Sequence, residues 1–443
     1  MKCFALGAAL LIFTFLPSVT AQESKPADLK GRTRMSRGDY ITVKAAVTGP
    51  GDELYFWWGH IGLLVEDSLS GKSTFYDWGL FSFDRENFFL DFAFGRLLYS
   101  CGAIPAEYVI PRTIAGNRDL TLYTLDLPPE AKVELAAFAE NCVLPENRNY
   151  WYHHFRDNCA TRVRDIIDMA TGGSLKSRFE DEPGRFTLRQ HVRRHTWFSP
   201  LWDWALNFWM GQGIDRPMTV WEEMFLPSEI ALCIEDFSYT DAFGIQRKLV
   251  SNTEVLSRAE GRPLVLDAPP QDLSRELLLG FCIAVLFSFL RFLPAARPAR
   301  KLGEANETWV RIFRGISGTL QSLAGLFLGT MGLLLFFMAF FTNHDYTYDN
   351  INVLFVNPLL LIAVPAGLIY GFTGKSKKRL TTELFLTVLW TIVFIAGLAT
   401  IVIRLFPGFQ QQNQPTQLLV LPFALVLSAI PLWVVRLVTP KKQ

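Results

Sequence analysis

Hydrophobic and polar positions divide the chain into two regions of different character. Up to about residue 270, apolar residues alternate with polar and charged ones over short stretches. From about 275 onward, short polar connectors separate long apolar runs, each about long enough to cross ~30 Å of hydrocarbon. The runs lie near 276–293, 315–341, 352–372, 383–405 and 417–438. This pattern predicts a globular head over 22–270, followed by an all-α membrane domain of about five helices over 271–443.

The head has the pattern of an α+β domain. Residues 54–66 and 73–78 are rich in aromatic and β-branched side chains, and a turn containing Gly71 joins them, which predicts a β-hairpin. Further strands are predicted at 106–112 and 119–126. Helical periodicity predicts helices at 129–141 and 159–170. A Trp-rich stretch over 183–235 is predicted to be helical in part.

Charge in the connectors predicts how the chain is oriented in the membrane. Basic residues gather between the first and second runs, between the third and fourth, and after the fifth. Because cytoplasmic loops carry the excess of Lys and Arg, the head over 22–270 is predicted outside the cell's inner membrane, in a multi-pass protein. Residues 1–21 agree, since a basic start, a short apolar core and a small residue at Ala21 are typical of a cleaved signal peptide.

Composition excludes some functions and leaves the cysteines open. The 443 residues include 43 Lys and Arg against 42 Asp and Glu, so the net charge gives no reason to expect nucleic acid as a partner. No zinc-type spacing, phosphate loop or dinucleotide fingerprint occurs, so neither a metal nor a cofactor is expected. In an oxidising compartment Cys101, Cys142 and Cys233 are available for a disulfide, although the sequence does not specify a pair.

Cys159 has the surroundings of a reactive thiol. Asp157 and Asn158 precede it and are favoured N-cap residues, so the thiol is predicted in the first turn of a helix. Unpaired N–H groups and the positive end of the helix dipole favour a thiolate there, and the same N–H groups can stabilise an oxyanion. A buried structural cysteine is the alternative that this pattern leaves open.

His60 and Asp77 complete a candidate triad. His60 follows Gly59 in the first strand of the predicted hairpin, and beside an activated thiol it is a natural general base. Asp77 lies on the second strand, where it can orient the imidazole. The alternatives are a core histidine bonded to a backbone carbonyl and an aspartate at the surface. His153 and His154 are either a second choice of base or a packing pair.

Two later segments predict surfaces. Residues 197–209 are rich in Trp, which favours a membrane–water interface, so we expect them to face the membrane. A basic run before them predicts a helix facing solvent or lipid headgroups; it contains Arg189, His191, Arg193, Arg194 and His195.

Five motifs occur in order between about residues 50 and 230. They are WGHIGL from Trp58, YDWGLFSFD from Tyr76, PENRNY from Pro145, DNCATRVRD from Asp157 and DRPMTVWEEMFLP from Asp215. Together they resemble the Lnb family of bacterial lipoprotein N-acyltransferases, and the likeness continues into the membrane part at 343–352. The resemblance implies a periplasmic head with a circularly permuted papain-like fold, in which the histidine precedes the cysteine in the chain.

The resemblance also implies a reaction. An acyl chain would move from a membrane phospholipid, through a thioester on Cys159, to the N-terminal amine of a diacylglyceryl-cysteine lipoprotein. His60 would be the base and Asp77 would orient it, although the family more often has an amide residue at that position. Substrate contacts are assigned to Trp58, Gly59, Asn158, Arg162 and His344.

Two other functions remain open from the sequence. The same triad would serve a membrane-tethered cysteine peptidase or amidase that acts on cell-wall peptides, although a single anchor would then suffice. A non-enzymatic receptor or assembly factor would use Cys159 only as a structural residue.

Overall fold

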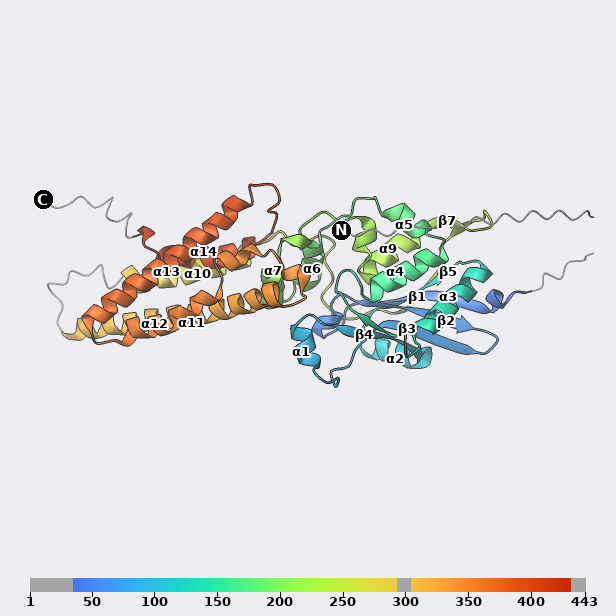
Figure 1. Cartoon of the computed structure of the whole chain (residues 1–443), viewed down its shortest axis with the longest axis horizontal. Helices are drawn as coiled ribbons and strands as arrows, with labels where there is room; N and C mark the ends of the chain where they lie inside the picture. The colour runs from blue at the N-terminus through green and yellow to red at the C-terminus, as the bar shows by residue number, and fades with distance from the viewer. Residues whose placement is uncertain (1–34, 293–303, 432–443) are drawn as a thin grey trace, which may run out of the picture. The chain divides into compact units, whose positions relative to one another are not determined.

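A seven-stranded antiparallel sheet forms the centre of the N-terminal region (Figure 1). Its strands, in pairing order, are β6 (Asn149–Trp151), β4 (Leu98–Pro105), β3 (Lys72–Leu80), β2 (His60–Asp67), β1 (Ile41–Thr48), β5 (Leu120–Leu125) and β9 (Val250–Ser257). A separate ribbon pairs β7 (Ser238–Thr240) with β8 (Gln246–Lys248). This computed structural model describes residues 35–292 and 304–431, so the predicted signal peptide at 1–21 lies outside the described residues.

The predicted hairpin lies in the middle of this sheet. β2 and β3 pair antiparallel, with Leu63 opposite Tyr76. The first strand begins at His60 rather than at 54, because Leu54–Phe56 form a 3-10 turn. The chain then turns at Gly59, whose φ is +75°, a conformation that glycine adopts at little cost.

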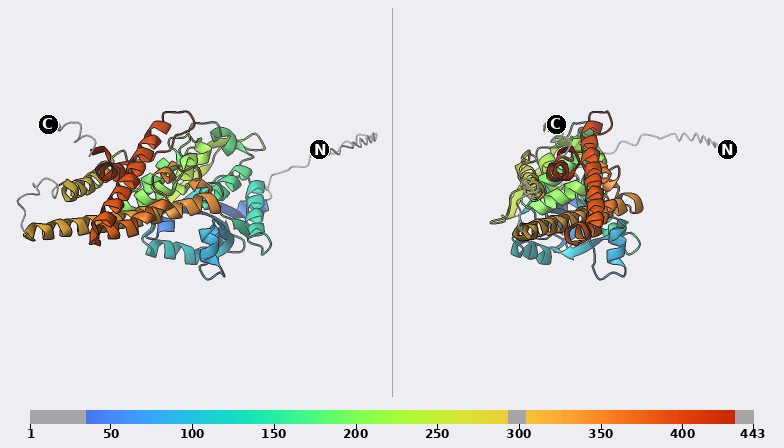
Figure 2. Two further views of the ribbon diagram at one scale, coloured as in Figure 1. Left: turned by 60° about the vertical axis from the view of Figure 1, so that its left-hand side comes forward. Right: turned by 90° about the vertical axis from the view of Figure 1, so that its left-hand side faces the viewer.

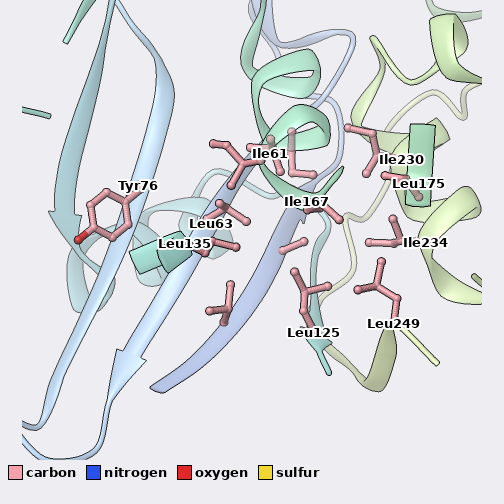
Figure 3. Close-up of a cluster of buried hydrophobic side chains, with 14 of the residues drawn as sticks. Ile61, Leu63, Tyr76, Leu125, Leu135, Ile167, Leu175, Ile230, Ile234 and Leu249 are labelled. Carbon is pink, nitrogen blue, oxygen red and sulfur yellow. The ribbon is translucent and has the colours of Figure 1, made fainter. Parts of the chain in front are cut away.

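Helices cover both faces of the sheet. On one face α3 (Pro129–Cys142), α4 (Cys159–Ala170) and α9 (Pro227–Glu235) contribute to the main core, which Figure 3 shows around Ile61, Leu63, Leu135, Ile167 and Ile230. On the other face α2 (Ala106–Ala115) packs over Leu64 and Phe75. Alternation along β2 explains the division, because neighbouring residues of a strand point to opposite faces.

Residues 106–112 are helical, so the strand predicted there is wrong. Ala106, Val109 and Ile110 pack together on the sheet, and spacings of three and four place them on one face of α2. The β-branched pair at 109–110 favours a strand by composition, but burial of this face decides for the helix. The strand of this region is β4, which ends directly before α2 at Pro105.

The basic helix α6 (Leu188–Thr196) is buried, which contradicts its predicted exposure to solvent or headgroups. Its charged residues and histidines are all less than a tenth exposed. Each of four has an acidic partner: Arg189–Asp215, His191–Glu223, Arg193–Asp203 and Arg194–Glu229. The partners lie between 10 and 35 residues later in the chain, so a local pattern of charges does not reveal them.

The C-terminal region is helical, drawn yellow to red in Figures 1 and 2. It contains α10 (Ser274–Phe292), α11 (Glu304–Phe341), α12 (Ala363–Phe372), α13 (Ser376–Ile403) and α14 (Gln414–Leu427). Among the described residues, three segments are long and apolar enough to cross a membrane: Glu307–Phe341, Ile351–Phe372 and Ser376–Ile403. These three correspond to the second, third and fourth predicted spans. The first prediction falls on α10, and the fifth starts in α14 and runs beyond the described residues.

Helix α7 (Pro200–Trp209) connects the two regions. Trp204 and Phe208 belong to the buried cluster of the membrane helices. Asn350 and Asn352, from the connector after α11, donate Nδ2 hydrogen bonds of 2.9 and 3.0 Å to the Phe208 carbonyl. Gln411, from the connector after α13, donates to the Met210 carbonyl at 3.2 Å. Both connectors that lack basic clusters are therefore bonded to the head.

Candidate active site

Cys159 is the first residue of α4, where its predicted cap places it. The Asn158 side chain accepts the Thr161 N–H at 2.9 Å, and the Thr161 hydroxyl oxygen accepts the Asn158 N–H at 2.8 Å. Asn158 also donates to the carbonyls of His154 and Phe225, so its amide is fully used in holding the loop. The Cys159 side chain is buried between helix and sheet. This capping box fixes the backbone of the first turn.

His60 and Asp77 lie on the adjacent strands β2 and β3. The His60 Nε2 is 2.9 Å from the Asp77 Oδ1, which also accepts the Gly79 N–H at 2.7 Å. Because Nε2 faces Asp77, Nδ1 is the ring nitrogen left to interact with the Cys159 thiol, whose charge acts on the imidazole. The structure thus brings together three side chains that are far apart in the sequence.

The surroundings of His60 and Asp77 favour the charged form of each. Burial opposes the positive form of His60, but the charges of Asp77 and Cys159, with the hydrogen bond to Asp77, raise the pKa of His60 well above 6.5. Burial also opposes the ionised form of Asp77, but His60 and the Gly79 N–H hold the pKa of this carboxyl below its usual value. An imidazolium beside the sulfur is the partner that a thiolate requires.

Two glycines allow close approaches at the site, one before the histidine strand and one beside the imidazole. A Cβ on Gly59 would lie 2.7 Å from the Thr48 carbonyl oxygen. A Cβ on Gly79 would lie 2.7 Å from the His60 Cε1 and 3.2 Å from the Asp77 Oδ1. The pairing of β3 with β4 shifts register just after Asp77, and such bulges commonly redirect a side chain next to a site.

The two regions of the chain match two models of one family. Residues 31–194 match the Lnb N-terminal periplasmic domain, and residues 311–440 match the Lnb transmembrane domain. The chain belongs to the Lnb family. The predicted family is confirmed, and the chain is a membrane protein with a periplasmic N-terminal domain. No curated protein and no solved structure matches the chain.

Two of the predicted substrate-binding residues of this Lnb chain have partners within the head. Arg162 on α4 pairs with Asp157 at 2.6 Å, and its guanidinium lies 3.6 Å from the centre of the Tyr150 ring. Trp58 stacks beside His195 of α6, with ring centres 6.5 Å apart. Both residues are close in sequence to the triad, Arg162 three residues after Cys159 and Trp58 two residues before His60, and both side chains have partners within the head.

His344 lies in the connector after α11 and contacts the head. Its Nε2 donates to the Phe92 carbonyl at 3.0 Å, and its Nδ1 accepts the Tyr346 hydroxyl at 2.8 Å. Burial lowers the pKa of His344, which keeps the ring neutral and suited to one donor and one acceptor. The structure gives this residue a position at the junction of head and membrane helices.

The alternative bases His153 and His154 are engaged elsewhere. The His153 Nε2 is 2.8 Å from the Asp345 Oδ1. Burial lowers the pKa of His154 to about 4, and the nearby His344 adds to this effect. The charge of Cys159 acts on His60, where it helps to raise the pKa of the imidazole.

Arg118 is a half-buried cation near the site that the sequence analysis missed. It donates to the Thr48 hydroxyl at 3.0 Å, and that hydroxyl donates to the His60 carbonyl at 3.2 Å. Burial and the charge of Arg262 lower the pKa of Arg118 to about 10, while the charge of Cys159 acts in the opposite direction. Arg118 is a single arginine in a turn 58 residues after His60 in the sequence, so no local pattern indicates that it lies near the histidine strand.

Tyr99 and Tyr152 form an aromatic wall that was also missed. Their rings stack with centres 4.1 Å apart. Burial raises the pKa of Tyr99 to about 12, and the charge of Cys159 contributes to the rise. Within the described ranges, no group of three His, Cys, Asp or Glu side chains is arranged to hold a metal ion. The site therefore offers a thiol, a base and apolar walls.

Proposed function

We propose that this protein is a lipoprotein N-acyltransferase of the bacterial inner membrane. It moves an acyl chain from a membrane phospholipid to the N-terminal amine of a diacylglyceryl-cysteine lipoprotein. The observation that carries the proposal is the hydrogen-bonded pair Asp77–His60 with the Cys159 thiol beside the imidazole, in a head that shares a buried cluster with membrane helices. The order of histidine before cysteine, with the thiol at a helix start against an antiparallel sheet, supports a circularly permuted papain-like fold.

The first half of the reaction acylates the enzyme. The Cys159 thiolate attacks the ester carbonyl carbon of the phospholipid, and the bond to the glycerol oxygen breaks. The His60 imidazolium gives its proton to that oxygen, so lysophospholipid leaves as an alcohol. The N–H groups of Cys159 and Ala160, which have no partner within α4, are placed to donate to the oxyanion of the tetrahedral intermediate.

The second half transfers the acyl group and restores the enzyme. The lipoprotein amine attacks the thioester carbon, and the carbon–sulfur bond breaks as an amide forms. His60, now neutral, takes the proton of the amine, which regenerates the imidazolium and the thiolate. Asp77 is a positioning residue: it holds the ring through Nε2 and favours its positive form.

Burial of the site supports transfer to an amine over loss to water. Cys159 is 9 % exposed, and the half-buried rings of Tyr99 and Tyr152 stack on each other near it. A thioester reacts readily with amines, and a site from which water is excluded limits its hydrolysis. The membrane helices are bonded to the head and would hold the site at the bilayer that contains both lipid substrates.

The test compares Cys159→Ser with Cys233→Ser, which changes a partly buried thiol of the same head. Each full-length chain is expressed in cells that lack lipoprotein N-acylation, and mass spectrometry measures the N-terminal lipopeptides. We expect the Cys233 variant to restore triacylated lipoproteins and the Cys159 variant to lose them. An equal yield from both would refute the proposal. Hydrolysis of cell-wall peptides without release of lysophospholipid would favour the peptidase alternative.

A further inference from the structure

Helix α1 (Phe88–Ala93) exposes large apolar side chains on the periplasmic head. Phe89, Leu90 and Phe92 are 75, 58 and 47 % exposed. Its acidic residue, Asp91, is paired with Arg85, so the helix presents little net charge. A contiguous exposed apolar patch of this kind indicates a surface that contacts a partner or a membrane.

This helix is bonded to the outer end of a membrane span. The Asn343 N–H donates to the Phe94 carbonyl at 2.9 Å, and His344 donates to the Phe92 carbonyl at 3.0 Å. The Phe94 ring also packs against Phe337 of α11, with centres 5.5 Å apart. A side chain on Gly95 would collide with the backbone at 343–344, so the approach is close.

The exposed apolar surface of α1 therefore continues that of α11. Phe340 and Phe341, in the last turn of α11, are 63 and 61 % exposed. They belong to the segment that is long and apolar enough to cross a membrane, so lipid surrounds them. The three bonds and contacts above place α1 at the same end of α11, where the chain leaves the bilayer. Lipid is the occupant that this continuity favours over a protein partner.

A series of aromatic rings runs from α1 toward the thiol. Phe92 lies next to Phe88, with ring centres 6.2 Å apart, and Phe88 lies 6.1 Å from Phe81. Phe81 lies 5.0 Å from Tyr99, which stacks on Tyr152 at 4.1 Å. Phe81 directly follows β3, the strand that carries the candidate aspartate, and the two tyrosines form the wall beside Cys159.

We propose that α1 lies in the outer lipid layer and that the acyl chain of the donor phospholipid follows these rings from the bilayer to Cys159. The inference rests on the proposed acyl transfer and adds a path for its donor. Apolar ring faces can contact an acyl chain along its whole length and do not require a particular position of double bonds or branches. The ester carbonyl at the end of the chain then reaches the thiol while the tail remains in apolar surroundings.

The activity test uses the full chain in phospholipid vesicles. The double variant Phe89→Ser, Leu90→Ser is compared with Phe243→Ser, which removes an equally exposed phenylalanine from the β7–β8 turn. Each chain receives a long-chain phospholipid in the vesicle and, separately, a water-soluble short-chain ester that acylates a thiol directly. We expect the double variant to lose at least about tenfold in transfer from the vesicle donor and to keep its reaction with the soluble ester. Equal transfer from the vesicle donor by both variants would overturn the inference.

A second measurement does not depend on turnover. A phospholipid carrying a diazirine in its acyl chain is photocrosslinked to the Cys159→Ser chain in vesicles. We expect labelled peptides that contain Phe81, Phe89 or Tyr99. Label confined to α11–α13 would overturn the inference even if acyl transfer is intact. Label at the rings in a wild-type chain that fails to acylate lipoproteins would support the lipid path and refute only the reaction.

Discussion

Gly79 offers the smallest change that should move the candidate base. The replacement Gly79→Ala adds one methyl group, and the φ of this residue is not positive, so alanine fits the backbone. The new Cβ would lie 2.7 Å from the His60 Cε1, whereas ordinary van der Waals contact begins at 3.4 Å. The imidazole must therefore retreat by about 0.7 Å. The Asp77 Oδ1, 3.2 Å from the new methyl, allows little movement on its own side.

This displacement predicts a large loss of rate and a smaller loss of stability. A misplacement of about 1 Å costs on the order of 100-fold in rate, so a shift of this size should cost about 10- to 100-fold. Overpacking at a partly buried position should lower the free energy of unfolding by about 1–3 kcal/mol. The two effects are separable because the first acts on the reacting geometry and the second acts on the whole fold.

The assay follows acylation of Cys159 by an isotope-labelled phospholipid, with thermal unfolding measured on the same samples. Gly213→Ala is the matched control, because a Cβ at that position meets nothing within 4 Å and its φ is not positive. We expect the control to keep the wild-type rate. If Gly79→Ala also acylates at the wild-type rate while it remains folded, His60 does not take part in the reaction.

Three further predictions concern charge. Asp77→Asn leaves the burial of His60 without its main opposing charge, so the pKa of His60 should fall and the alkaline limb of the acylation rate should move to lower pH; an unchanged limb would contradict this. In the wild type, the His60–Asp77 pair stabilises the fold fully at pH values below about 6.5, the histidine pKa of the unfolded chain. This stabilisation disappears as pH rises through the pKa of His60 in the folded protein, and free energies of unfolding from denaturant titrations at several pH values measure the loss. Arg189→Met leaves the buried Asp215 carboxylate without its ion-pair partner and should destabilise the protein by about 3–5 kcal/mol. The same change at the exposed Arg216 should cost less than about 1 kcal/mol. Equal shifts of the unfolding temperature in calorimetry would contradict this reasoning.

Structural features that depend only on neighbouring residues in the sequence were predictable. Asn158 followed by a helical pattern is sufficient to place Cys159 in a first turn, because capping depends on neighbouring residues alone. The pairing of two strands across a short turn likewise brings His60 near Asp77, although the left-handed Gly59 delays the start of the first strand.

Features that depend on distant residues were not predictable. Arg118 is beside the histidine strand only because β5 pairs with β1, and no local pattern indicates that pairing. The buried charges of α6 require acids from other elements before they can leave water. The ring series joins residues from four places in the chain, and exposed phenylalanines near 88–92 have no periodicity that identifies their use.

The bonds between α7 and the membrane connectors bear on how this protein can be prepared. A fragment cut near residue 270 would strip the Phe208 and Met210 carbonyls of their amide donors and uncover Trp204, which membrane helices bury. We expect such a fragment to aggregate in solution or to misplace the adjoining loops. Inhibitor screening and crystallisation should therefore begin from the intact polypeptide in detergent or nanodiscs, because the N-terminal region needs the membrane connectors to complete its packing.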